Sequence, residues 1–369
     1  AREGILVEDD LADSLPQAAA RLGRDPATAA IFLKDGRPFR RGERLVQTDL
    51  ADTLAAVARG GPDAFYRGPV AEKIVASVRA AGGVMTVDDL ARYRVIERKP
   101  VRGTYRGYEV VSMPPPSSGG VHLVQILNIL EGFDLAAMGA GSADALHILA
   151  EAMKPAYADR AAWLGDPDRV DVPVRGLTSK LYADSLRIAI DKDRARPAEE
   201  VKAGDPLPYE SDQTTHFSVV DKDGNAVSNT YTLNFSYGAG FVAAGTGVLL
   251  NNEMDDFAAK VGALNAYGLV GGETNSVAPG ARPLSSMTPT FLFKDGKLAL
   301  VTGSPGGSRI ITTVLQVIVN VVDFGMNIAE AVVAPRIHHQ WQPDRLLVES
   351  GLSPDTLRIL ATRGQKVTV

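Results

Sequence analysis

The apolar positions of the first hundred residues recur at helical spacing between short polar turns. The spacing predicts amphipathic helices over residues 48–60 and 71–81, and each apolar stripe is closed by a pair of glycines. Thr86 and Asp89 resemble a capping box with Asp in the place of Glu, and they predict a third helix that runs to Tyr93. We interpret these helices as packing elements without chemistry of their own.

The middle of the chain changes from strand to helix at a proline-rich loop. Residues 101–112 alternate around Arg106-Gly107 and predict two strands, whereas residues 121–130 predict a helix. The loop between them, residues 113–120, holds three consecutive prolines, which exclude a helix and a central strand. We interpret the loop as a structural corner, with an anion site at the helix N-terminus as the alternative.

The second half of the chain has a different pattern. Residues 191–212 are dense in charge, Pro and Gly, which favours an exposed, flexible segment and suits a linker or a cleavage site. Residues 215–233 and 290–302 each alternate on both sides of an Asp-Gly turn and predict β-hairpins. Residues 310–322 predict a helix with an apolar face so wide that it must be buried on more than one side. Hairpins covered by buried helices predict an α+β layered domain.

Composition excludes several classes of protein. The chain has no cysteine, which excludes a disulfide framework, a thiolate metal site and a cysteine nucleophile. Its 39 Lys+Arg and 44 Asp+Glu give a net charge of −5, which argues against a nucleic acid as partner. The sequence has no run of 18 or more apolar residues, so we expect no membrane span within it.

A search for common nucleotide-binding and metal-binding motifs finds none in the sequence. The sequence has no G-x-x-x-x-G-K-[ST] for nucleotide phosphates and no H-E-x-x-H. The five histidines show no ligand spacing beyond the adjacent pair His338-His339. Because adjacent residues of a strand point to opposite faces, we interpret this pair as packing and expect neither a metal nor a cofactor.

Three polar clusters in the second half remain as candidate sites. Residues 213–216 place a hydroxyl side chain at the head of a strand, and residues 251–256 follow a short apolar strand. The third cluster combines residues 283–289 with residues 303–309, where the amides of Gly306-Gly307 could converge on a developing negative oxygen. Each cluster alone is typical of a turn. Together they would suit a substrate that carries both an ammonium and a carboxylate.

Four blocks of the sequence resemble the signature blocks of the γ-glutamyltranspeptidases, and the likeness extends over essentially all 369 residues. The blocks are residues 214–221, 251–257, 282–289 and 302–312. The resemblance implies the fold of the N-terminal-nucleophile hydrolases, a four-layer αββα sandwich, incomplete here at both ends. The bacterial, secreted branch is most similar, which implies a periplasmic or secreted protein.

The resemblance also implies a precursor that cleaves itself at the Gln213–Thr214 bond. Residues 1–213 would be the C-terminal part of the large-subunit region and residues 214–369 the small-subunit region, truncated at its C-terminus, and together they would form one catalytic unit. The Thr214 hydroxyl would attack the preceding carbonyl, and water would cleave the ester left by an N→O acyl shift. The freed α-amine, with a pKa of about 8, would then activate the same hydroxyl.

The family's catalytic roles fall on four residues of this chain. Thr214 would attack the γ-carbonyl of glutathione or another γ-glutamyl compound and form a γ-glutamyl-enzyme. Gly306 and Gly307 would supply the oxyanion-hole amides, and Thr232 would assist processing. The acyl group would then pass to water, an amino acid or a short peptide.

Further residues would bind the donor. Its α-ammonium would be held by Asn234, Glu253 and Asp256, and its α-carboxylate would accept hydrogen bonds from Ser285 and Ser286.

The segment 260–271, with Tyr267, resembles the lid of the family members that have one. The family chain begins upstream of Ala1, where an arginine for the donor carboxylate lies, and continues with further strands past Val369. We therefore expect the sequence to be an internal fragment that is unstable or inactive alone.

Two other functions stay open. A glutaryl or cephalosporin acylase shares the fold and the nucleophile, but its substrate lacks the α-ammonium and would have no use for the charge of Asp256. A non-catalytic binding homologue is the second alternative, and the presence of Thr214 with the Gly306-Gly307 and Ser285-Ser286 pairs argues against it.

Overall fold

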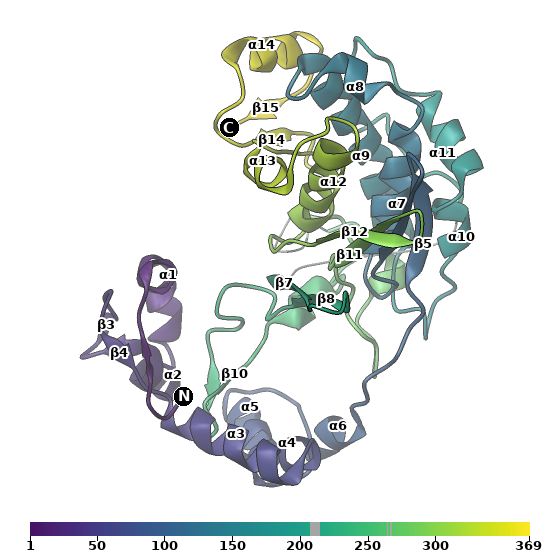
Figure 1. Cartoon of the computed structure of the whole chain (residues 1–369). Helices are drawn as coiled ribbons and strands as arrows, with labels where there is room; N and C mark the ends of the chain where they lie inside the picture. Colours follow the sequence, from purple (N-terminus) through teal and green to yellow (C-terminus); the bar gives the residue numbers. More distant parts are fainter. Residues whose placement is uncertain (207–214, 264, 266–267) are drawn as a thin grey trace. The chain divides into compact units, whose positions relative to one another are not determined.

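The computed structural model describes residues 1–206, 215–263, 265 and 268–369 (Figure 1). They divide into two compact units, one of residues 1–97 and 235–252, the other of residues 98–234 and 253–369. No helix among the described residues has the length and apolarity to cross a membrane.

The smaller unit consists of short helices and two-stranded antiparallel sheets. Its helices are α1 (Asp9–Leu22), α2 (Pro26–Phe32), α3 (Thr48–Gly60), α4 (Asp63–Tyr66), α5 (Pro69–Ala80) and α6 (Val87–Arg92). The paired strands are β1 (Ile5–Leu6) with β4 (Arg44–Leu45), β2 (Leu33–Lys34) with β3 (Arg37–Pro38), and β9 (Val242–Ala243) with β10 (Val248–Leu249). The predicted helices are confirmed, and Thr86 and Asp89 form the predicted capping box at the start of α6.

Residues 235–252 belong to the core of the smaller unit, although they lie far along the chain. Val242 of β9 is buried with Leu15, Leu22 and Phe32. The Val242 amide donates to the Thr28 hydroxyl at 2.7 Å, which satisfies a buried polar group at the start of α2.

The larger unit contains a four-stranded antiparallel sheet in the order β12-β11-β6-β5. Its strands are β5 (Val101–Tyr105), β6 (Tyr108–Ser112), β11 (Thr290–Lys294) and β12 (Lys297–Thr302). Ser112 pairs with Thr290, so the central pairing joins one predicted hairpin to another from the far end of the chain. The remaining strands are β7 (Thr215–Val220) with β8 (Ala226–Tyr231), and β13 (Ile337–His338), β14 (Leu346–Val348) and β15 (Val367–Thr368) in a three-stranded sheet.

Three long helices form the core of the larger unit, and the fold is mixed α/β. They are α7 (Gly119–Leu130), α9 (Ala143–Trp163) and α12 (Arg309–Val322). Every residue of α7 is buried, because this helix packs on β5 and β6 and also contacts α9 and α12. The predicted burial of α12 is confirmed. The shorter helices are α8 (Leu135–Met138), α10 (Val174–Leu177), α11 (Lys180–Arg187), α13 (Ile328–Val333), α14 (Pro354–Thr362) and the 3-10 turns η1 (Glu253–Asp256) and η2 (Glu273–Asn275).

The proline-rich loop is a structural corner that turns β6 into α7. The helix begins at Gly119, two residues earlier than predicted. A Cβ at Gly119 would overlap the Met287 carbonyl oxygen, and one at Gly120 would overlap the Met113 carbonyl oxygen. Gly119 is therefore needed for α7 to approach the segment that leads into β11, and Gly120 for its close contact with the end of β6 and the loop.

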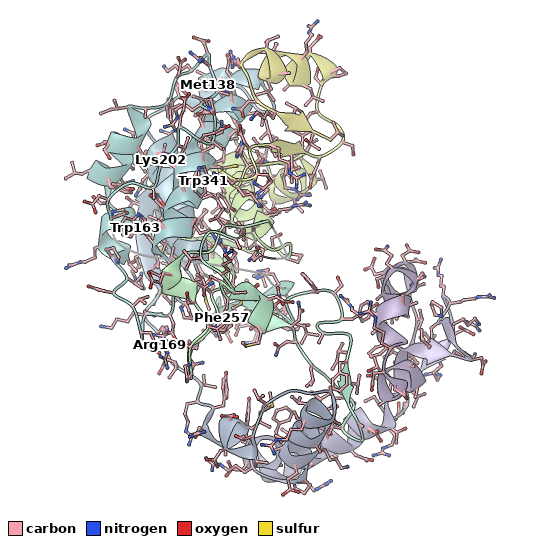
Figure 2. All side chains as sticks on the ribbon, turned by 180° about the vertical axis from the view of Figure 1, so that it is seen from behind. Met138, Trp163, Arg169, Lys202, Phe257 and Trp341 are labelled. Atoms are coloured by element: carbon pink, nitrogen blue, oxygen red, sulfur yellow. The ribbon has the colours of Figure 1, made fainter. Side chains whose placement is uncertain are left out.

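The prediction of an exposed segment over residues 191–212 holds for Glu199 and Glu200 but is wrong for three apolar residues between 195 and 201. Ala195, Ala198 and Val201 are buried. The indole of Trp341, labelled in Figure 2, donates to the carbonyls of Ala198 and Val201 at 2.9 and 3.0 Å. The charged residues of this segment made its three small apolar residues, which are spaced three apart, difficult to recognise as buried positions. Residues 207–212 lie outside the described part of the chain.

We expect Gly119→Ala to lower the free energy of unfolding by about 1–3 kcal/mol, because its methyl group would meet main-chain and buried atoms that cannot rotate away. Urea denaturation monitored by circular dichroism measures the change. Gly176→Ala, where a Cβ meets Pro206 at an ordinary 3.5 Å, is the control and should not destabilise the protein. Equal stability of the two variants would contradict the close approach at Gly119.

Candidate active site

The two predicted oxyanion-hole glycines lie on the turn between β12 and α12. Gly306 has φ +125° and Gly307 has φ +66°, a backbone region that favours glycine. Their carbonyls accept the amides of Arg309 and Ile310 at 3.2 and 2.9 Å, which ties the turn to the first residues of the helix. Among the described residues, neither glycine amide donates to an acceptor. Both amides are therefore available to a negative oxygen.

A buried polar network supports this glycine turn. The Ser308 hydroxyl donates to the Gln340 Oε1 atom at 2.8 Å, and the His338 Nε2 atom lies 2.9 Å from the same oxygen. The Gln340 oxygen can only accept, so His338 carries its proton on Nε2, and its Nδ1 accepts from the Thr312 hydroxyl at 2.8 Å. Burial, aided by neighbouring arginines, lowers the pKa of His338 to about 3 and keeps the ring neutral. The network fixes the turn and one wall of a pocket of about 290 Å³.

The start of β7 lies against the same turn. A Cβ at Gly303 would overlap the His216 ring, so the ring packs directly on the main chain at the end of β12. The Ser228 hydroxyl of β8 donates to the Thr302 carbonyl at 3.3 Å. The hairpin that begins immediately after Thr214 is thus joined to the glycine turn.

The predicted serine pair, Ser285-Ser286, is fixed by the proline-rich loop. The Ser285 amide donates to the Pro116 carbonyl at 2.9 Å, and the Ser118 amide donates to the Ser285 carbonyl at 2.8 Å. The hydroxyls of Ser117 and Ser118 both lie 3.1 Å from that carbonyl. Both members of the pair are buried. The corner loop therefore determines where the two hydroxyls lie.

Sequence reasoning missed Arg160, which lies in the last turn of α9. Its side chain is 1% exposed, and its Nη2 atom donates to the Ser286 hydroxyl at 3.4 Å. Tyr157, one turn earlier on α9, donates its hydroxyl to the Ser308 carbonyl. One helix therefore contacts both the serine pair and the glycine turn. No sequence signal separates Arg160 from the other charges of α9, because charge in a helix normally indicates an exposed face.

The predicted acidic residues lie on η1. Asp256 is buried, and its carbonyl accepts the side-chain amide of Asn275 at 2.7 Å. Burial raises the pKa of Glu253 to about 7, and a hydrogen bond with Asp256 opposes the shift. Two carboxyl groups that share this environment would gain from a cation, since a nearby positive charge favours their ionised forms.

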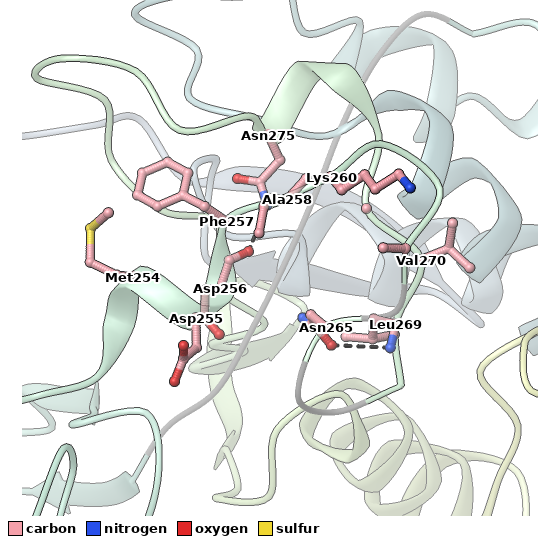
Figure 3. Close-up of a pocket in the computed structure, with 13 residues that line it drawn as sticks. Met254, Asp255, Asp256, Phe257, Ala258, Lys260, Asn265, Leu269, Val270 and Asn275 are labelled. Atoms are coloured by element: carbon pink, nitrogen blue, oxygen red, sulfur yellow. Dashed lines mark hydrogen bonds between the residues drawn. The ribbon is translucent and has the colours of Figure 1, made fainter.

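A pocket of about 270 Å³ lies beside η1 (Figure 3). Asp255 and Asp256 line it, together with Asn275 and the described parts of the lid-like segment, residues 260–271. Within that segment, the Asn265 side-chain oxygen accepts the Leu269 amide at 3.1 Å. The segment predicted to resemble a lid therefore does border a pocket that contains a predicted donor-binding residue.

Two further predicted residues follow β8. The Asn234 amide donates to the Thr232 hydroxyl at 2.8 Å. Asn234 has φ +71° and a buried side chain, so its conformation is one that few residue types other than Gly and Asn adopt readily. Gln213, Thr214 and Tyr267 lie outside the described residues.

The histidine pair packs in two different environments. His338 lies beneath the glycine turn, whereas His339 lies 3.4 Å from Asp344. Within the described residues, no group of three or more His, Asp or Glu side chains could hold a metal ion.

Known proteins resemble this chain over its whole length. The family model described as Gamma-glutamyltranspeptidase matches residues 1–369. The chain is 58% identical to a glutathione hydrolase proenzyme of Escherichia coli (strain K12), over 100% of this chain and 64% of the relative. It is 52% identical to a glutathione hydrolase proenzyme of Pseudomonas sp. (strain A14), over 99% of this chain and 64% of the relative. The chain therefore spans less than two thirds of these relatives.

A solved structure has the same fold. It is that of a cephalosporin acylase from Bacillus halodurans, with a TM-score of 0.87 and 30% identity over 100% of this chain and 65% of the acylase chain.

We predict that Glu253 makes stability depend on pH in one direction. Its pKa is raised from 4.5 to about 7 in the folded protein, so the folded state holds the proton more tightly than the unfolded state. The stabilisation is complete below about pH 4.5 and is lost as the pH rises through about 7. The melting temperature of the unmodified protein should thus fall relative to that of Glu253→Gln between pH 5 and pH 8.

Glu273→Gln is the control for this prediction, because it removes an exposed carboxyl from the neighbouring turn η2. Its melting temperature should follow that of the unmodified protein across the range. A difference between the unmodified protein and Glu253→Gln that stays constant with pH would contradict the raised pKa.

Proposed function

Because the chain belongs to the γ-glutamyltranspeptidase family, we propose that it forms the catalytic part of an enzyme that hydrolyses and transfers γ-glutamyl groups. The precursor is cleaved at the Gln213–Thr214 bond, and Thr214 becomes the N-terminal nucleophile. Its α-amine takes the proton of its own hydroxyl, which attacks the γ-carbonyl of glutathione or a related donor. The leaving amine departs with that proton, and the γ-glutamyl-enzyme is then resolved by water, an amino acid or a peptide.

The oxyanion of this reaction is stabilised at the turn between β12 and α12. Gly306 and Gly307 donate their amides to it, and both have positive φ angles that favour glycine at these positions. Thr232 assists processing. In support of this role, its neighbour Tyr231 pairs with Thr215, the residue that follows the nucleophile.

The donor is held at both charges of its amino-acid end. Asn234, Glu253 and Asp256 bind the α-ammonium, while Ser285 and Ser286 donate to the α-carboxylate. Tyr267 and the lid-like segment cover the donor pocket.

The observation that carries this proposal is the pair of carboxyl groups on η1. The donor ammonium brings a positive charge that favours the ionised forms of both carboxyl groups, and the raised pKa of Glu253 reflects the cost of burying its charge. A substrate without an ammonium group would make no ionic interaction with the two carboxyl groups.

The proposal extends to the organisation of the whole protein. Residues 1–213 and 214–369 belong to a large and a small subunit that together form one catalytic unit. Their strands and helices arrange as the four-layer αββα sandwich of the N-terminal-nucleophile hydrolases. The protein works in the periplasm or is secreted, as in the bacterial branch of the family, and its reaction uses no cofactor.

A cephalosporin or glutaryl acylase is the alternative function. The likeness to the acylase of Bacillus halodurans favours it, because the two chains share their fold at 30% identity. The glutaryl group carries a terminal carboxylate but no ammonium, so an acylase gains nothing from the negative charge of Asp256. This difference makes Asp256 the residue that separates the two functions.

We expect Asp256→Asn to lower kcat/KM for γ-glutamyl p-nitroanilide by about 10- to 100-fold, the value of one hydrogen bond to a charged group. Hydrolysis of glutaryl p-nitroanilide should stay constant or rise. Release of p-nitroaniline measures both rates. Asp255→Asn removes an exposed carboxylate from the same pocket wall and is the matched control, with both rates retained. An unmodified protein that prefers the glutaryl donor would establish the acylase instead.

A further inference from the structure

We propose that Arg160 and Ser118 are positioning residues that hold the Ser286 hydroxyl in place for the α-carboxylate of a γ-glutamyl donor. The inference rests on the proposed function and deepens it. Neither residue belongs to the three polar clusters of the sequence, and neither need touch the donor.

Arg160 gives the Ser286 hydroxyl a fixed role. A guanidinium can only donate hydrogen bonds, so the Ser286 oxygen accepts from the Arg160 Nη2 atom, 3.4 Å away. The Ser286 hydrogen is then left for another acceptor. The contact with Arg160 therefore sets the direction of the Ser286 hydroxyl.

Ser118 completes the arrangement from the opposite loop. Its hydroxyl lies 3.1 Å from the Ser285 carbonyl, to which it can only donate, and 3.3 Å from the Ser286 hydroxyl. The Ser118 oxygen therefore accepts from Ser286, and the bonds run in one direction, from Arg160 through Ser286 and Ser118 to the Ser285 carbonyl. A carboxylate that enters next to Ser286 needs only to rotate one O–H group toward itself.

The charge of Arg160 strengthens this donor. Its guanidinium lies close enough to His122 and His338 to lower the pKa of both rings, in addition to the larger effect of burial. The same positive potential acts on Ser286, which is in direct contact. A hydroxyl that accepts from a cation becomes a better donor to an anion, because successive hydrogen bonds polarise one another. The ligand class that this chain of bonds fits is a carboxylate.

The test compares two donors that differ only in the α-carboxylate. They are γ-glutamyl p-nitroanilide and 4-aminobutanoyl p-nitroanilide, which keeps the ammonium but has hydrogen in place of the carboxylate. We expect Arg160→Met to lower kcat/KM for the first donor by about 10- to 100-fold, mainly through KM, and that for the second by less than about twofold. Arg160→Lys should recover part of the loss, and Ser118→Ala should cost about three- to tenfold for the first donor alone.

Arg187→Met is the matched control. Arg187 is partly buried, lies at the end of a helix as Arg160 does, and donates to the carbonyls of Ile129 and Asn128 at the end of α7. Its removal should therefore change kcat/KM for both donors by the same factor. Equal losses for the two donors in Arg160→Met and Ser118→Ala would overturn the inference and assign these residues to the fold alone.

If Arg160→Met does not fold, the test uses Arg160→Lys and Ser118→Ala instead. If both variants keep the ratio of the two kcat/KM values that the unmodified protein shows, the inference is overturned. A full-length protein that hydrolyses neither donor would overturn the proposed function and this inference with it. An unmodified protein that prefers the γ-glutamyl donor, with variants that keep that preference, would overturn only the inference.

Discussion

The carbonyl oxygen of Ser285 is the point on which the larger unit depends. It receives the Ser118 amide and lies within reach of two serine hydroxyls, so the loop between β6 and α7 is fastened to the segment that leads into β11. The contact extends the pairing of β6 with β11 beyond the sheet, and it requires a helix that begins with two glycines. Because α7 is buried on all sides, the position of that corner also sets the positions of α9 and α12. The serine pair and the glycine turn of the candidate site are in contact with residues of these elements or of the loops that precede them.

Buried charge is the second constraint on the site. Arg160 lies next to the serine pair, and Glu253 with Asp256 lies on a separate turn of the same unit. Burying an ionised group is costly unless it is paired and hydrogen-bonded. A γ-glutamyl donor carries one positive and one negative charge on a single carbon atom. Cationic and anionic groups held apart in one unit are suited to such a ligand, because each favours the opposite charge of the donor.

The sequence predicted those features that depend on local physical rules. Helix caps such as Thr86 with Asp89, the Asp-Gly hairpins and the wide apolar face of α12 each depend on neighbouring residues, and the structure has them. Features that depend on residues far apart in the chain were not predicted from the sequence. The burial of Arg160 requires Ser286, far along the chain, and the packing of Ala198 requires Trp341. At both positions the charged local composition indicated exposure to solvent, but packing against a distant partner buries the residue. The predicted nucleophile could be named only through family resemblance, because a threonine before a strand has no distinctive local pattern.

We propose that Thr214 is freed by cleavage and then carries the acyl group. Mass spectrometry of protein quenched during turnover with a γ-glutamyl donor tests this role directly. We expect a peptide with Thr214 at its N-terminus that has gained the mass of one γ-glutamyl group and that loses it when an acceptor amino acid is added. A chain that stays intact across Gln213–Thr214, or an acyl group found on any other residue, would contradict the proposed role of Thr214.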